Sequence, residues 1–148
     1  VRNHFIDLED GTRRPDYDNF SVYFNTDWYG RFRGLFIEGN SLVAPIFRAW
    51  MEPFHDLGFA HLLPVPTGGT DSVSFNEAGL PGFKFLQDDL EYFTKTWHSN
   101  MDVYDRIVAA DLMGNAAILA SFAYHAAMRD EKIPRVDTPV ISKRSLNR

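Results

Sequence analysis

The 148-residue sequence contains no cysteine, which excludes disulfide bonds and thiolate ligands for a metal. Any zinc would have to be held by nitrogen and oxygen atoms. No apolar run approaches the ~20 residues that a membrane-spanning helix needs, and this argues against insertion into a bilayer. These absences leave the compartment open, because both cytosolic and secreted proteins can lack cysteine.

Clusters of basic residues are also missing. The net charge is −5, and pairs such as Arg13-Arg14 and Lys143-Arg144 are ordinary solvated pairs, so nucleic acid is a poor candidate partner. The sequence is 45% hydrophobic and 15% aromatic, which is enough for one domain over residues 1–148 to bury a core. Residues 135–148 carry charges and little apolar content, and we expect a surface or disordered tail there.

Short apolar runs alternate along the chain with longer stretches of helical spacing. The predicted strands lie near residues 21–27, 33–38, 61–65 and 82–87. The predicted helices lie near residues 42–57, 74–78 and 111–128. This alternation predicts a three-layer α/β sandwich with a central, mixed and twisted β-sheet flanked by helices. The first two strands could form a hairpin or pair in parallel through a crossover.

The ends and faces of the two long helices can also be predicted. We expect Ser41 and Asp111 to cap their amino ends, Gly58 to end the first helix, and Pro53 to bend its last turn. One stripe of the second helix carries small apolar residues that allow close packing on a sheet. The stripe consists of Leu112, Ala116, Leu119, Ala123 and Ala126.

Two potential metal ligands each follow a predicted strand. Asp27 closes the first strand, and His98 lies in the loop that follows the buried strand 82–87. Open α/β sheets place ligands and metals at the carboxyl ends of their strands, so the two side chains make half of a plausible metal site. From the residues alone, Asp27 could equally shape a turn, and His98 could simply bond to backbone.

Five motifs occur in a fixed order and, taken together, carry more weight than any one alone. They are Asn25-Thr26-Asp27, the strand from Arg33-Gly34 to Gly39-Asn40, the loop Gly68-Gly69-Thr70-Asp71, the strand Leu80-Pro81-Gly82-Phe83, and His98-Ser99-Asn100-Met101-Asp102. Over residues 15–134 this set resembles the zinc exopeptidases of metallopeptidase family 28, which include secreted bacterial aminopeptidases and plasma glutamate carboxypeptidase.

The resemblance implies a site with two zinc ions, in which Asp27 binds one ion and His98 the other. It implies hydrolysis of a terminal peptide bond through a metal-bridging hydroxide, a peptide or dipeptide substrate, and a secreted or periplasmic protein. The residues expected to orient ligands or line the substrate pocket are Asp71, Ser72, Trp97 and Tyr92.

The resemblance also implies parts that this sequence does not contain. The family uses a His-x-Asp pair and an adjacent Glu-Glu pair, one of which is the general base, upstream of the matched region. The chain begins with Val1 rather than methionine. We therefore expect the carboxyl-terminal part of a larger domain, completed by an amino-terminal half. No catalytic base is identified in this chain, which we expect to be inactive alone and to bind zinc weakly or not at all.

Several departures from the family pattern leave alternatives open. Ser72 stands where the family usually has histidine, and Trp28-Tyr29 stands where Asn-Gly is common. The step Trp97-His98 also resembles glutaminyl cyclase, an acyltransferase with one zinc. A non-catalytic, metal-free binding module of the same fold is the other alternative. The choice between aminopeptidase and carboxypeptidase stays open.

Overall fold

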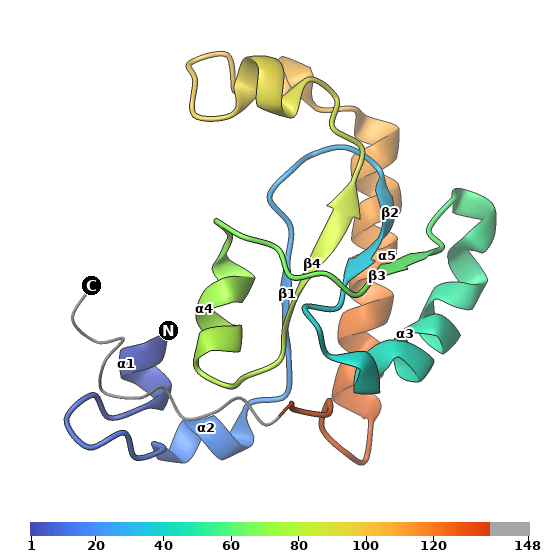
Figure 1. Cartoon of the computed structure of the whole chain (residues 1–148). Coiled ribbons are helices and arrows are strands. Elements are labelled where there is room, and N and C mark those ends of the chain that lie inside the picture. The colour runs from blue at the N-terminus through green and yellow to red at the C-terminus, as the bar shows by residue number, and fades with distance from the viewer. Residues whose placement is uncertain (137–148) are drawn as a thin grey trace.

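A computed structural model describes residues 1–136 and centres on a mixed, four-stranded sheet (Figure 1). The strands lie side by side in the order β1-β4-β2-β3. The central strand β4 runs parallel to β1 and antiparallel to β2, and β2 runs parallel to β3. Their bounds are β1 (Tyr23–Asn25), β2 (Phe32–Phe36), β3 (His61–Leu63) and β4 (Gly82–Gln87).

Helices lie on both sides of this sheet, so the predicted three-layer α/β arrangement is confirmed (Figure 1). The long helix α5 (Ala109–Met128) and α3 (Ala44–Met51) cover one face. Helix α4 (Asp71–Glu77) packs on β1 and β4 from the other side. Two short helices, α1 (Arg2–Phe5) and α2 (Pro15–Asn19), lie beside α4. Short 3-10 helices span Ser41–Val43, Glu52–Leu57 and Tyr104–Arg106, and a π-helix spans Tyr92–Thr96.

The two-residue period of the strands separates apolar from polar side chains. Phe83 and Phe85 of β4 are buried and contact the rings of helices α3 and α5. Tyr23, Asn25 and Lys84 alternate with these apolar residues and therefore face the side of α4. The sheet thus has one face of aromatic rings and one face with a polar strip. Among residues 1–136, no helix is both long and apolar enough to span a bilayer.

Both connections that the sequence left open between the first two strands, a hairpin and a parallel pair with a crossover, are wrong, because β1 and β2 run in opposite directions and do not pair. β4 lies between β1 and β2, so these strands are not neighbours, and residues 26–31 cross the end of β4 instead. The bounds of β4 were predicted correctly. The other three strands are shorter than predicted, because pairing with neighbours stops where the chain turns away from the sheet.

The predicted helices are present, with changes at their ends. The first breaks at Met51 and continues as a 3-10 helix, since Pro53 lacks the N–H that an α-helix requires. It ends at Gly58, which has a φ of +79°. Neither predicted cap forms: Asn40 and Val108 occupy the capping positions. Asp111 lies in the first turn of α5 and pairs instead with Arg31.

The predicted packing face of α5 is wrong. Ala116 and Ala123 are exposed, and Leu112 is 49% exposed, although Leu119 and Ala126 pack partly on the core. The buried side chains are Asp111, Asn115, Ile118 and Phe122. Two of these four are polar, so a count of apolar residues alone gives the wrong rotation of the helix. Asn115 is buried because it bonds to the backbone of Phe32 and Gly30.

Candidate functional site

The topology brings the chain segments of the two predicted ligands to one edge of the sheet. Asp27 lies two residues beyond the end of β1, and the segment that leads to His98 leaves from the end of β4. β1 and β4 are neighbours and parallel, with Asn25 in register with Lys84. Their carboxyl ends therefore lie together, which is where open α/β sheets bind ligands.

The Asp27 carboxylate is held by the side chains of Lys84, Thr70 and Asn25. Its Oδ1 accepts a hydrogen bond of 2.8 Å from Asn25 Nδ2, and its Oδ2 lies 2.7 Å from the Nζ of Lys84. The side chains of Lys84 and Asp27 are 10% and 27% exposed. The ammonium of this pair is thus buried at the sheet edge, whereas the carboxylate is partly open to solvent and is oriented by Asn25.

Asn25 is itself held from two sides. Its Nδ2 also donates to Thr70 Oγ1 at 2.6 Å, and its Oδ1 accepts a hydrogen bond of 3.0 Å from the Tyr23 hydroxyl. The Tyr23 ring stacks on Phe75 of α4, with 4.2 Å between ring centres. The Gly-Gly-Thr-Asp loop and helix α4 are therefore joined to Asp27 through one amide side chain.

The charges around Asp27 keep it ionised. Partial burial raises the pKa of Asp27, but hydrogen bonds from Lys84, Thr70 and Asn25, together with the Lys84 charge, hold the pKa below its ordinary value. Burial and then the negative charge of Asp71 and Asp27 raise the pKa of Tyr23. Burial, followed by Asp27, also raises the pKa of Tyr92. At neutral pH the site therefore offers one carboxylate beside two phenol donors.

The loop after Asp27 is fixed by Gln87 at the end of β4. Gln87 Oε1 accepts from the Thr26 hydroxyl at 2.8 Å and from Trp28 N at 3.2 Å. Its Nε2 donates to the carbonyls of Trp28 and Gly30 at 2.6 and 2.9 Å. A Cβ at Gly30 would lie 2.0 Å from the Asp88 carbonyl oxygen, so only glycine fits the close approach of this loop.

His98 lies in a loop with unusual backbone geometry. The loop contains a π-helix over Tyr92–Thr96, and His98 has a φ of +54° and an exposed side chain. Such features occur often at functional sites. The loop is anchored by Thr96, whose buried Oγ1 lies 2.8 Å from the Tyr29 hydroxyl. This bond ties the His98 loop to the segment that follows Asp27.

A row of aromatic rings joins the surroundings of His98 to those of Asp27. The Trp28 ring contacts Phe93 with 5.1 Å between centres, and Phe93 contacts Trp97 at 5.8 Å. Trp97 in turn lies 4.5 Å from the imidazole of His98. Tyr92 contacts Trp28 at 5.6 Å. Tyr92 and Trp97, two residues predicted to line the site, thus belong to one aromatic wall.

The two remaining predicted residues lie at the start of α4. Asp71 is exposed and is near enough to influence the pKa of Tyr23. Ser72 is fully buried, and a Cβ at Gly82 would come within 2.8 Å of its carbonyl oxygen. The Ser72 hydroxyl finds no hydrogen-bond partner within residues 1–136. Ser72 therefore contacts the first residue of β4, whereas Asp71 has access to solvent.

Within residues 1–136, no three side chains of His, Asp or Glu come together in a way that could hold a metal ion. Asp27 fits one ligand position by its chemistry, because it is an ionised carboxylate oriented by Asn25. However, the ammonium of Lys84 is ion-paired with the other carboxylate oxygen, Oδ2. The residues that the structure describes therefore do not by themselves form a metal site.

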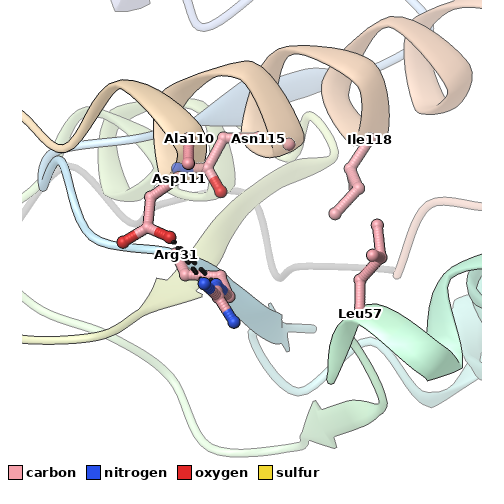
Figure 2. A pocket seen from close by; sticks show the side chains of 7 residues that line it. Arg31, Leu57, Ala110, Asp111, Asn115 and Ile118 are labelled. Atoms are coloured by element: carbon pink, nitrogen blue, oxygen red, sulfur yellow. Dashed lines mark hydrogen bonds and ion pairs between the residues drawn. The ribbon is translucent and has the colours of Figure 1, made fainter.

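A small cavity of about 170 Å³ lies on the other face of the sheet, at the start of α5 (Figure 2). Arg31, one of the lining residues, points toward Asp111, with a distance of 3.0 Å between Nε and Oδ1. Leu57 and Ile118 face one another across it. None of its lining residues contacts Asp27, and its ion pair joins the first turn of α5 to the residue before β2.

Comparison with known proteins decides the family. The profile of peptidase family M28 matches residues 3–123, which is most of the chain. The chain belongs to peptidase family M28. The predicted resemblance to zinc exopeptidases is thereby confirmed, and the motifs around Asp27, Asp71 and His98 all lie within the matched range. Among curated proteins, none matches this M28 chain significantly.

Two solved structures share the fold of this M28 chain. A peptidase M28 precursor from Shewanella amazonensis superposes with a TM-score of 0.63 at 22% identity, covering 78% of this chain and 27% of that one. A zinc aminopeptidase from Bacillus subtilis superposes with a TM-score of 0.54 at 24% identity, covering 82% of this chain and 31% of that one. The chain thus spans less than a third of the length of either structure.

Sequence reasoning missed two residues that hold Asp27 and the loop after it. Lys84 and Gln87 were not singled out, although each is buried and polar. One signal was available for Lys84, which interrupts the apolar run Phe83 to Leu86. A lysine inside a buried strand requires a charged partner, and Asp27 was the carboxylate expected at the adjacent edge.

Proposed function

We propose that this chain is the carboxyl-terminal part of the catalytic domain of a zinc exopeptidase, which removes residues from the ends of peptides or dipeptides. The observation that carries the proposal is the position of Asp27, an ionised and oriented carboxylate at the shared edge of β1 and β4. Family membership supports the peptidase activity. The zinc aminopeptidase from Bacillus subtilis, which shares the fold, supports the metal.

In this proposal Asp27 holds one zinc ion and His98 the other. When bound, zinc supplies a hydroxide nucleophile at neutral pH and polarises the scissile carbonyl. The residues of this chain would hold and orient the metal ligands. Asn25 fixes the Asp27 carboxylate, and Gln87 fixes the loop that follows Asp27. Trp28, Tyr92 and Trp97 form the wall that excludes water beside the substrate. Asp71 orients a ligand or the substrate from solvent.

The remaining ligands and the general base belong, in this proposal, to an amino-terminal half that precedes the chain. The 148-residue chain alone should therefore release no amino acids and bind zinc weakly. Each ion would receive one of the three protein ligands that are usual in catalytic sites. We also expect a secreted or periplasmic protein, which is consistent with the precursor from Shewanella amazonensis.

The test is amino-acid release from a panel of peptides by the protein that joins this chain to the proposed amino-terminal half. Asp27→Asn and His98→Ala should each lose more activity than the about 10–100-fold that the loss of an outer-shell residue costs. Asp105→Asn changes an exposed carboxylate of a 3-10 turn and should keep full activity. Full activity in Asp27→Asn would contradict the proposal.

One observation favours a second candidate, a metal-free binding module of the same fold. The Lys84 ammonium already balances the charge of Asp27 without a metal. The amino-terminal sequence distinguishes the two candidates: a His-x-Asp pair and a Glu-Glu pair favour the peptidase, and the absence of both favours the module.

A further inference from the structure

Lys84 is the feature of the site that a metal-binding role for Asp27 does not explain. It lies in the central strand between two buried phenylalanines, and its side chain is only 10% exposed. Its Nζ lies 2.7 Å from Asp27 Oδ2 and 5.0 Å from the centre of the Trp28 ring. A lysine in such surroundings would be costly without its partner, so the ammonium and the carboxylate depend on each other.

The ammonium and a metal ion would compete for the same carboxylate. Zinc binds carboxylate oxygens at about 2.0–2.2 Å, and Oδ2 of Asp27 already carries the ammonium at 2.7 Å. Oδ1 already accepts the hydrogen bond from Asn25, and Thr70 also interacts with the carboxylate. A metal ion at Asp27 must either displace Lys84 from Oδ2 or bind beside a positive charge. Both routes lower the affinity for the metal.

Trp28 gives the ammonium a second point of contact. The ring face attracts a cation, and this attraction is independent of the bond to Asp27. Lys84 could therefore leave Oδ2 while it keeps contact with Trp28, which makes displacement by a metal less costly than full expulsion into an apolar interior. The same contact holds Lys84 close to the site, where it continues to repel the metal.

We propose that Lys84 is a built-in competitor of the metal ion at Asp27. Its ammonium neutralises and orders the carboxylate of the metal-free chain and lowers the affinity of this side of the site for zinc. The inference rests on the proposed role of Asp27 as a zinc ligand. In this inference Lys84 sets the affinity of the site for the metal ion and has no assigned contact with the substrate.

The test measures zinc affinity directly on the 148-residue chain. Zinc chloride is titrated into isotope-labelled protein while the amide NMR signals of residues 25–30 are followed. Lys84→Gln removes the charge but keeps a hydrogen-bond donor, and we expect it to bind zinc at least tenfold more tightly than the unmodified chain. Lys84→Arg keeps the positive charge, so its affinity for zinc should stay as low as that of the unmodified chain. Lys95→Gln removes a lysine from an exposed pair with Glu91 and should change nothing.

Two further variants separate this inference from the proposed function. In Asp27→Asn combined with Lys84→Gln, the gain in affinity should disappear. If Lys84→Gln binds no more tightly while Asp27→Asn still weakens binding, Lys84 is not a competitor and Asp27 remains a ligand. If Asp27→Asn leaves zinc affinity unchanged both with Lys84 present and in Lys84→Gln, the competitor role of Lys84 and the ligand role of Asp27 are both contradicted.

A measurement without zinc tests the ordering role of the ammonium. The urea midpoint of Lys84→Gln should lie below that of the unmodified chain, because Asp27 then loses its charged partner. This difference should shrink when Asp27 is already asparagine. Equal midpoints for Lys84→Gln and the unmodified chain would overturn the claim that Lys84 orders the site.

Discussion

The two faces of the sheet are built by different means. On the side of α3 and α5, Phe122 is fully buried and its ring contacts the rings of Phe24, Phe47, Trp50, Phe59 and Phe85. On the side of α4, a chain of polar groups runs from Tyr23 through Asn25 and Asp27 to Lys84. Ring packing stabilises without strict direction, whereas each bond of the polar chain requires a matched donor and acceptor.

The comparison implies that the aromatic face provides most of the stability of the fold, whereas the polar face fixes the arrangement of the Asp27 loop. Losing a ring should therefore unfold the protein more readily than losing a polar partner. Losing a polar partner should in turn alter the Asp27 loop while the rest of the fold persists. Four predictions test this division, from the largest expected effect to the smallest.

Removing the central ring of the aromatic face should have the largest effect. Phe122→Ala deletes a fully buried side chain, and we expect the free energy of unfolding to fall by about 3–5 kcal/mol. Phe93→Ala removes a ring that is 54% exposed, so it should change stability by about 0.5 kcal/mol or less. Urea denaturation measures both. Similar losses for the two variants would mean that Phe122 is not the centre of the core.

A charge on the buried stripe of α5 should be nearly as harmful. Ile118→Glu places an unpaired carboxylate among buried apolar groups, and we expect it to destabilise by about 3 kcal/mol. Ala116→Glu lies on the exposed side of the same helix and should be within about 0.5 kcal/mol of the unmodified chain. The comparison uses urea midpoints. Greater harm from Ala116→Glu would restore the helix rotation expected from the sequence.

Gln87→Leu should have an intermediate effect that stays local. It removes the side chain that bonds to Thr26, Trp28 and Gly30, and leaves some of these groups buried without a partner. We expect a loss of about 2 kcal/mol. Hydrogen exchange should then be faster in residues 26–30 but unchanged in α5. Faster exchange throughout α5 would show that the polar face also supports the core.

The pH dependence of the Asp27 pair should be the smallest effect. The pKa of Asp27 is lowered in the folded chain. Its contribution to stability is therefore complete above the ordinary aspartate pKa of about 3.9 and is lost as pH falls through the lower folded-state value. The difference in urea midpoint between the unmodified chain and Asp27→Asn should be constant from pH 5 to 8 and narrow below about pH 4. The exposed Asp105→Asn serves as control. A difference that widens in acid would contradict the ion pair.

The sequence predicts the parts of this fold that depend on local patterns. β4 matches its predicted bounds because Phe83, Phe85 and Leu86 form a short apolar segment directly after Leu80-Pro81-Gly82. Gly58 ends its helix because the chain needs a left-handed residue there. The order of the strands depends on pairing between distant segments, so the position of β4 between β1 and β2 was not predictable. The family resemblance was recognised from the order of several motifs along the chain. Hydrophobic periodicity alone would not have indicated the family.

The site was predictable only in outline. The sequence predicted that Asp27 follows a strand, and in the structure it lies just beyond the carboxyl end of β1; its role as a ligand stays a prediction. Its partner Lys84 could not be paired with it, since the two lie 57 positions apart and the contact requires β1 beside β4. The orientation of α5 failed for a related reason: Asn115 is buried by bonds to distant backbone groups. The joint metal site of Asp27 and His98 stays a prediction.

The most direct test of the central claim is a crystal structure with zinc of the protein that joins this chain to its proposed amino-terminal half, located by anomalous scattering at the zinc edge. Two zinc peaks roughly 3.5–4 Å apart are expected. One should lie about 2.0–2.2 Å from a carboxylate oxygen of Asp27, and the other about 2.0–2.1 Å from a ring nitrogen of His98. Zinc bound elsewhere, or side chains of Asp27 and His98 separated by more than roughly 10 Å, could not serve such a pair of ions and would contradict the account.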